Sequence, residues 1–132
     1  MADMIPFDLV SPERLLLSEE AEMVTLPGAD GYFGVLPGHA PVISTLKPGV
    51  IEVQGGPAGN ARYFVSAGFA EVTASRLTVL AEDVIAVNTV DAATLDKKIA
   101  DADEDILQAR TDAARAKAVA TLDTLKQLRA AL

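Results

Sequence analysis

The segment from Gly31 to Pro41, which reads GYFGVLPGHAP, surrounds a short apolar stretch with glycines and prolines and holds the chain's one histidine, His39. Glycine readily adopts positive φ, and proline fixes φ and removes a hydrogen-bond donor. Such a run predicts a shaped loop between strands rather than a flexible linker. It contains no nucleophile beside a base and no cluster of metal ligands. We therefore expect this segment to make contacts rather than to perform chemistry.

The composition of the whole chain narrows the classes of function. The 132 residues are half hydrophobic, which predicts a globular domain, alone or with a small appendage. The absence of cysteine excludes disulfides, thiolate metal sites and a cysteine nucleophile. The net charge of −8 argues against nucleic-acid binding. The N-terminus has no basic region typical of a signal peptide, and no apolar run approaches the roughly 20 residues that span a bilayer, so we expect no direct membrane insertion.

The first two thirds of the sequence predict a β structure. Short apolar stretches alternate with turn residues, and helical periodicity is absent. The pattern predicts about nine strands and an antiparallel sandwich or barrel. The expected strands span residues 7–10, 15–17, 20–26, 32–36, 42–46, 50–53, 62–67, 69–73 and 76–80, with 84–87 as a further candidate.

Two turns between these strands have recognisable chemistry. Lys47-Pro48-Gly49 suits a type II turn, with proline at its second position and glycine at its third. Residues 55–60 form a glycine-rich loop whose Gly and Asn residues tolerate left-handed conformations. Because no Lys-Ser/Thr pair follows, this loop does not predict a phosphate-binding site.

From Asp91 onward the apolar spacing is helical. A first stripe comprises Leu95, Ile99, Ala102 and Ile106, and a second comprises Ala118, Leu122, Leu125 and Leu132. Asp91 or Thr94 could cap the first helix, and Thr111-Asp112 the second. The break near residues 108–112 contains no Gly or Pro, so one bent helix remains an alternative to a hairpin.

Charge in this helical region is uneven. The first helix ends in an acidic cluster, residues 101–105, whereas the second segment is basic. Folding back would bring the acidic end near Arg110 and Arg115, although each exposed pair would contribute only about 0–1 kcal/mol. Two thin apolar stripes make a marginal hairpin, which should open or dock elsewhere at little cost.

The candidate chemical sites are weak. His39 has no orienting acid or nucleophile near it in the sequence, so we interpret it as a loop or interface residue. The acidic cluster lacks the central glycine and the final glutamate of a calcium loop. We therefore predict no catalytic residue, no metal and no cofactor. The basic second helix could contact an acidic partner or could be an ordinary solvated face; the charges alone leave both open.

Three segments of the β region, in their order and spacing, resemble a known family. The segment from Gly31 continues as PVISTLKPGV over residues 41–50, and VSAGFAEV at 65–72 precedes LTVLAE at 77–82. Together they resemble the epsilon subunit of F-type ATP synthases, called delta in mitochondria. The resemblance covers nearly the whole chain. It implies an N-terminal β-sandwich of about ten strands over residues 1–88, which binds gamma and the c-ring, and a C-terminal two-helix hairpin over 89–132 with a regulatory role.

The resemblance also implies a function. Such subunits are non-catalytic parts of the central stalk, which couple c-ring rotation to gamma while the complex makes ATP from ADP and phosphate. The implied place is the cytoplasmic side of the bacterial inner membrane, as a peripheral protein. In many bacteria the C-terminal helices extend and inhibit ATP hydrolysis. When extended, these helices are expected to meet the catalytic alpha and beta subunits. The residues expected to contact beta are basic: Arg115, Lys117, Lys126 and Arg129.

Two departures from the family pattern affect the expected sites. The position after Gly31 is often acidic and meets the c-ring; here it is Tyr32, with Asp30 as a substitute, so we expect the c-ring contact at Asp30, Gly31 and Tyr32. Some relatives bind ATP through an Ile/Leu-Asp-x-x-Arg-Ala motif, but Ile99 stands where that arginine would be. Lys97 or Lys98 could replace the charge of that arginine but not its direction or the forked geometry of its guanidinium. A regulatory ATP-sensing module is the alternative function, and a small sandwich enzyme is a weaker one.

Overall fold

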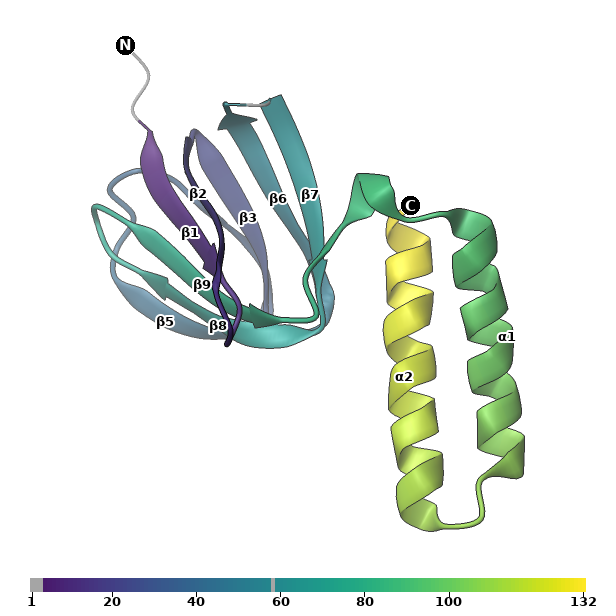
Figure 1. The fold of residues 1–132 in the computed structure, drawn as a ribbon. Helices are drawn as coiled ribbons and strands as arrows, with labels where there is room; N and C mark the ends of the chain where they lie inside the picture. The colour runs from purple at the N-terminus through teal and green to yellow at the C-terminus, as the bar shows by residue number, and fades with distance from the viewer. Residues whose placement is uncertain (1–3, 58) are drawn as a thin grey trace. The chain divides into compact units, whose positions relative to one another are not determined.

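The computed structural model describes residues 4–57 and 59–132, so Met1 to Asp3 and Ala58, in the glycine-rich loop, lie outside the described residues. The chain forms two compact units, one ending at Ala86 and the other running from Val87 to Leu132 (Figure 1). The first unit holds the strands β1 Ile5–Val10, β2 Leu15–Ala21, β3 Met23–Gly28, β4 Gly31–Val35, β5 Val42–Leu46, β6 Gly49–Gly56, β7 Gly59–Val65, β8 Ala67–Val72, β9 Leu77–Glu82 and β10 Ile85–Ala86. The second holds a short 3-10 turn, η1 Val87–Thr89, and the helices α1 Ala92–Gln108 and α2 Asp112–Ala131.

The strands of the first unit form one continuous curled sheet that folds over its own core (Figure 1). Their order is β10-β7-β6-β3-β5-β8-β9-β1-β2, and β4 pairs with the other edge of β3. The predicted fold class, a sandwich of about ten strands followed by two helices, is confirmed. One pairing differs from a purely antiparallel sheet, because β1 runs parallel to β9, with Phe7 opposite Leu77.

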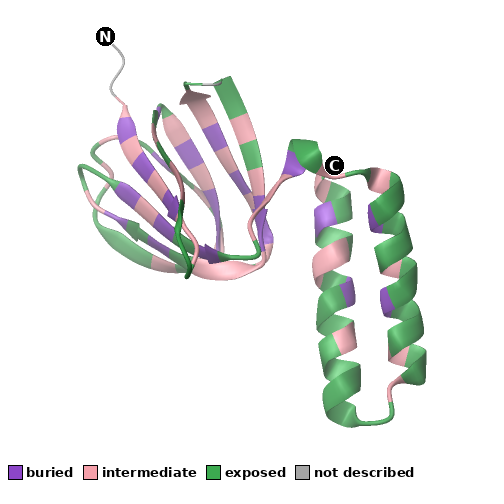
Figure 2. Ribbon diagram, in the orientation of Figure 1, coloured by how far each residue is buried: buried purple, intermediate pink, exposed green. Residues whose placement is uncertain are grey.

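Alternation of side chains builds the core of this unit. In β1 and β9 every second residue is buried, as a period of two requires (Figure 2). The largest side chains that are fully buried include Phe7, Ile5, Leu9, Leu26 and Ile51, which belong to one apolar cluster. Burying each such side chain stabilises the fold by about 1.5–3 kcal/mol.

The predicted strand over residues 20–26 is wrong, because the chain changes partners inside it. Ala21 ends β2 opposite Ile5 of β1, whereas Val24 of β3 lies between β4 and β6. Between them Glu22 forms a bend, and its N–H donates to the carbonyl of Gln54 at 2.9 Å. The apolar alternation changes phase at the adjacent Met23 and Val24, a signal that the strand prediction over 20–26 did not use.

The predicted type II turn at Lys47-Pro48-Gly49 is also wrong. Gly49 does not have the positive φ that such a turn needs at its third position. Instead Lys47 N–H donates to the carbonyl of Pro27 at 3.0 Å, and Gly49 begins β6. Glycine is required there by packing: a Cβ on Gly49 would lie 2.6 Å from the Tyr32 hydroxyl and 2.7 Å from Cβ of Pro27.

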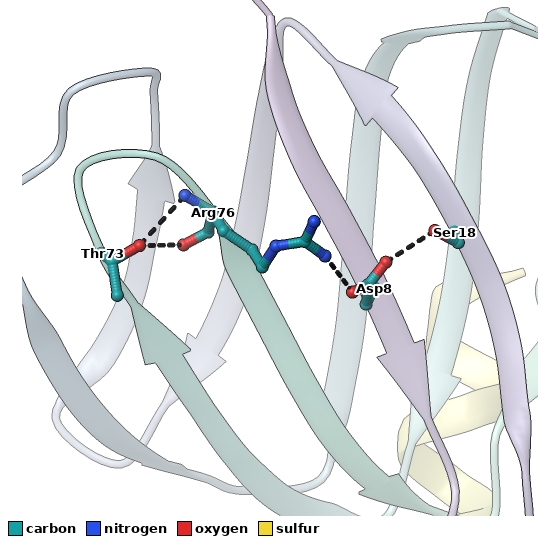
Figure 3. Close-up of polar contacts among 4 residues, drawn as sticks. All are labelled: Asp8, Ser18, Thr73 and Arg76. Carbon is teal, nitrogen blue, oxygen red and sulfur yellow. Dashed lines mark hydrogen bonds and ion pairs between the residues drawn. The ribbon is translucent and has the colours of Figure 1, made fainter.

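A polar cluster bridges β1 to the strands on either side of it (Figure 3). The Asp8 carboxylate on β1 accepts from the guanidinium of Arg76, which precedes β9, and from the hydroxyl of Ser18 on β2 at 2.7 Å. Thr73 Oγ1 accepts from the N–H of Arg76 at 3.1 Å, which orders the turn before β9. Asp8 therefore connects both neighbours of β1 through side chains.

The second unit is an antiparallel helical hairpin, and the bent-helix alternative is wrong. Asp91 caps α1, and Thr111 caps α2 by accepting from the N–H of Ala114 at 3.0 Å. Hydrogen bonds from the Thr94 hydroxyl and from the N–H of Ala93 lower the pKa of Asp91. The C-terminus of α1 and the N-terminus of α2 are joined by the short connection around Arg110.

Candidate binding surfaces

The turn between β3 and β4 presents the residues expected at the c-ring. Ala29 and Asp30 form its tip, Gly28 pairs with Gly31 across it, and Gly31 has a φ of 131° that favours glycine. The N–H of Ala29 donates to the carbonyl of Thr45 at 2.9 Å, which ties the turn to β5. Asp30 is exposed at this ordered tip.

Tyr32 lies directly after the turn on β4. Its side chain is 57% exposed, yet its hydroxyl accepts a hydrogen bond from the N–H of Val50 at 3.1 Å. The expected c-ring residues Asp30, Gly31 and Tyr32 are thus neighbours on one rim, and the tyrosine also has a structural role. Whether they contact a c-ring stays a prediction.

His39 occupies a different place in the unit. Its Nδ1 donates to the carbonyl of Ala40 at 2.7 Å, and Gly38, with a φ of 81°, donates its N–H to the carbonyl of Ala74 at 3.1 Å. The Asp30 turn precedes β4 and His39 follows it, so the two sites lie toward opposite ends of this strand. An extended strand rises about 3.4 Å per residue, which keeps its ends well apart. The structure does not bring these two predicted sites together.

An exposed apolar face was missed by the sequence analysis. On β5, β8 and β9 the side chains of Ile43, Phe69 and Leu80 are 73%, 55% and 43% exposed. Phe69 is the direct cross-strand partner of both Thr45 and Leu80. Phe69 and Leu80 border a hollow of about 200 Å³ that Pro12 also lines. The signal available for this face was the period of two in β8: because Ala70 and Val72 point into the core, Phe69, directly before them in the alternation, must point outward.

Electrostatics on the sandwich single out one tyrosine. Burial, and to a lesser degree the negative charge of Glu19, raise the pKa of Tyr63 on β7.

Within residues 4–57 and 59–132, no group of three or more His, Cys, Asp or Glu side chains is arranged to hold a metal ion. Neither helix in the same ranges is long and apolar enough to cross a membrane.

The basic residues of α2 differ in their surroundings. Arg115, Lys117 and Lys126 are exposed. Arg129 Nε lies 2.9 Å from a carboxylate oxygen of Asp96 on α1, so this arginine is engaged within the hairpin. We expected charge compensation near Arg110 and Arg115. Among the described residues of the hairpin, the ion pair lies at the opposite end instead, between Asp96 and Arg129.

Comparison with known proteins identifies the family. Residues 4–87 match the family model described as the ATP synthase delta/epsilon chain, beta-sandwich domain. The chain belongs to the ATP synthase delta/epsilon family. An epsilon chain of Parvibaculum lavamentivorans is 52% identical over 98% of both chains, and one of Mesorhizobium japonicum is 46% identical over 100% of this chain and 98% of its own.

Solved structures agree with this family. A chain of the Euglena gracilis mitochondrial ATP synthase, solved as OSCP, F1 and c-ring, has a TM-score of 0.83 and 26% identity, covering 97% of this chain and 81% of its own. A chain of the Tetrahymena thermophila enzyme, with 15% identity and a TM-score of 0.70, shows the same fold over 96% of this chain and 95% of its own. The resemblance inferred from the sequence is confirmed: this delta/epsilon family member is an ATP synthase subunit.

Proposed function

We propose that the chain is a non-catalytic central-stalk subunit that couples rotation of the c-ring to the gamma subunit. Membership of the delta/epsilon family supports this role, as does the likeness to a chain in an F1 and c-ring assembly. The observation that carries the proposal is a sandwich that presents both an exposed apolar face and a hydrogen-bonded turn with the exposed Asp30 at its tip. A coupling element needs two such surfaces on one rigid body.

The apolar face formed by Ile43, Phe69 and Leu80 is the proposed gamma-binding surface. Side chains of this size are rarely left exposed as neighbours without a partner. Changing Phe69→Glu should abolish capture of gamma by the purified chain, because it places a charge in the centre of the interface. Leu107→Glu, at an apolar position on α1 that is more exposed than Phe69 (85% against 55%), is the control. Unchanged capture by the Phe69 variant would refute this surface.

The rim of Asp30, Gly31 and Tyr32 is the proposed c-ring contact. Asp30 is exposed at a turn held by hydrogen bonds on both sides, so its charge has a defined position. In the assembled enzyme, Asp30→Lys should lower ATP-driven proton pumping more than ATP hydrolysis. Glu13→Lys, on the exposed turn before β2, controls for the change of net charge. Equal loss of pumping in both variants would contradict the assignment.

The hairpin, residues 87–132, is the proposed regulatory element. Binding to a partner need only exceed a small packing free energy to displace a marginal hairpin. Arg115, Lys117 and Lys126 are exposed for an acidic surface of the beta subunits, and Arg129 would join them once its bond to Asp96 breaks. Deleting residues 87–132 should raise ATP hydrolysis by the assembled enzyme. If hydrolysis does not change, the inhibitory role is wrong.

The alternative function is ATP sensing. Calorimetry distinguishes it from the coupling role by measuring whether the purified chain binds ATP. Asp96, which stands at the aspartate of the ATP-binding pattern, is already bound to Arg129, and Ile99 is part of the apolar stripe. We therefore expect weak or no ATP binding by the purified chain. Clear binding at physiological ATP would favour the sensing function.

The proposed place is the cytoplasmic face of a bacterial inner membrane, reached through the other subunits. A peripheral subunit should remain with washed membranes and leave them in low-salt buffer together with the rest of F1. Release only by detergent would argue against this placement.

A further inference from the structure

The exposed apolar face of the sandwich has a carboxylate beside it. Strands β5, β8 and β9 lie next to one another in the sheet (Figure 1). Thr45, Phe69 and Leu80 are cross-strand partners, so they form one row across this face. Glu82 follows Leu80 by two residues on β9, and the period of two places both side chains on the same side of the sheet.

The hollow of about 200 Å³ on this face combines apolar walls with that carboxylate. Pro12, Phe69 and Leu80 contribute apolar surface, and Glu82 also borders the hollow. Among the described residues that line it, Glu82 alone carries a charge. The hollow is smaller than the roughly 300–1,000 Å³ of small-molecule pockets. It therefore suits a single side chain of a partner protein better than a free ligand.

The carboxylate of Glu82 is available to a partner. Within the part of the chain that the structure describes, it forms no ion pair. Its backbone is held in place, because its carbonyl accepts a hydrogen bond from the N–H of Ser66 at 3.2 Å. The next residue, Asp83, has a φ of 50°, and its carboxylate accepts from the Ser66 hydroxyl at 2.9 Å. The turn thus presents the Glu82 side chain from a fixed backbone position.

A basic side chain has the chemistry that fits this hollow. Lysine and arginine bury their aliphatic stems along apolar surface while the charged head stays free to pair. A cation near the ring of Phe69 is also attracted by the negative face of that ring. An apolar occupant would instead bury the Glu82 carboxylate without a partner, which is strongly unfavourable. An acidic occupant would be repelled.

We propose that the hollow receives a lysine or arginine side chain of gamma, with its stem against Phe69 and Leu80 and its charge against Glu82. This proposal rests on the proposed gamma-binding function of the apolar face. It adds that the face selects a partner surface by its charge as well as by its shape. Glu82 is then a specificity-determining residue of the interface.

Binding of the full-length chain to an F1 complex that lacks it tests the charge. Glu82→Gln keeps the size of the side chain and should weaken binding about tenfold. Glu71→Gln is the matched control: Glu71 is exposed opposite Ile43 on the same face but does not line the hollow, so binding should weaken less than about twofold. Equal losses in the two variants would show that the hollow has no special part, against the proposal.

Salt dependence provides a second measurement on the same variants. Raising the ionic strength should weaken binding of the unchanged chain and of Glu71→Gln to a similar degree, because dissolved ions screen the charge pair. Binding of Glu82→Gln should depend less on salt, since the pair is already lost. The same salt dependence in all three proteins would contradict the pairing.

Phe69→Glu distinguishes failure of this inference from failure of the proposed function. If Phe69→Glu abolishes binding while Glu82→Gln leaves it unchanged, the apolar face binds gamma but no basic side chain pairs in the hollow. If Phe69→Glu also leaves binding unchanged, the face itself is not the gamma surface, and both proposals are wrong.

Charge reversal keeps the test valid if glutamine at position 82 disturbs the turn. Glu82→Lys should weaken binding more than Glu82→Gln, because like charges then meet. Lysines and arginines of gamma are replaced by glutamate one at a time. One replacement should weaken binding of the unchanged chain and restore binding of Glu82→Lys. If no replacement restores it, gamma places no basic side chain against Glu82 and the proposal is wrong.

Discussion

The hydroxyl of Tyr32 on β4 accepts a hydrogen bond from the backbone N–H of Val50 on β6, at 3.1 Å. β3 pairs with both of these strands, so the tyrosine side chain reaches across it. The pairing of β3 with β6 ends at Thr25 and Glu52, and the hydroxyl serves Val50 beyond that point. The proposed c-ring rim is thereby fixed to a strand that is remote from it in the sequence.

Replacing this tyrosine tests the contact. Tyr32→Phe keeps the ring but leaves Val50 N–H without its acceptor, and should lower the free energy of unfolding by about 0.5–1.5 kcal/mol. Urea denaturation measures the loss, and amide exchange at Val50 should accelerate. Tyr63→Phe, the control, should leave exchange at Val50 unchanged. A Val50 amide that stays equally protected in Tyr32→Phe would show that the bond does not form in solution.

The close approach at Gly49 predicts a larger loss. Gly49→Ala would place a methyl 2.6 Å from the Tyr32 hydroxyl and 2.7 Å from Cβ of Pro27, so backbone or ring must move. We expect a loss of about 1–3 kcal/mol in denaturation experiments. Gly34→Ala is the control, since its nearest neighbour is the flexible Met23 side chain at 3.3 Å. Equal losses in the two variants would contradict the packing argument.

The ion pair of Asp8 with Arg76 should be weak and dependent on salt. The Arg76 side chain is 53% exposed, so a double-mutant cycle with Asp8→Asn and Arg76→Gln should give a coupling free energy of about 0.2–1 kcal/mol. Raising the ionic strength should reduce it. Ser18→Ala removes the hydrogen bond from an uncharged hydroxyl to the Asp8 carboxylate, and its effect should depend less on salt than the ion pair does. A coupling free energy that stays the same in high salt would mean that dissolved ions do not screen this pair.

The raised pKa of Tyr63 predicts a loss of stability in alkali. Its pKa in the folded protein lies above that of the unfolded chain, about 10, because burial and then the charge of Glu19 disfavour the phenolate. The folded state therefore holds this proton more tightly, and stability should be unaffected below pH 10 and fall as the pH rises through the folded pKa.

Ultraviolet titration of the Tyr32→Phe variant isolates Tyr63, since the chain has two tyrosines. Adding Glu19→Gln should lower the midpoint only part of the way, because burial is the larger cause. A midpoint at or below the ordinary value would show that the phenol is solvated. A midpoint that Glu19→Gln leaves unchanged would remove the glutamate from the explanation.

Much of the local structure was predictable from the sequence. Strand β5 was predicted at its observed bounds, both helices were predicted, and the caps Asp91 and Thr111 were among the candidates. Side-chain alternation, cap chemistry and turn residues act over a few positions, so a linear sequence shows them. Where the signal was ambiguous, as at the bend of Glu22, the prediction failed.

The family and its two-part architecture were thus readable from linear motifs, because motifs and periodicity are properties of neighbouring residues. Tertiary structure alone decided which distant residues meet. The parallel pairing of β1 with β9, the bond between Tyr32 and Val50, and the Asp96–Arg129 pair each join residues far apart in the chain. Such contacts depend on how the sheet curls and how the helices register, and they result from packing of the whole unit. The same packing leaves Phe69 exposed while the adjacent Ala70 is buried.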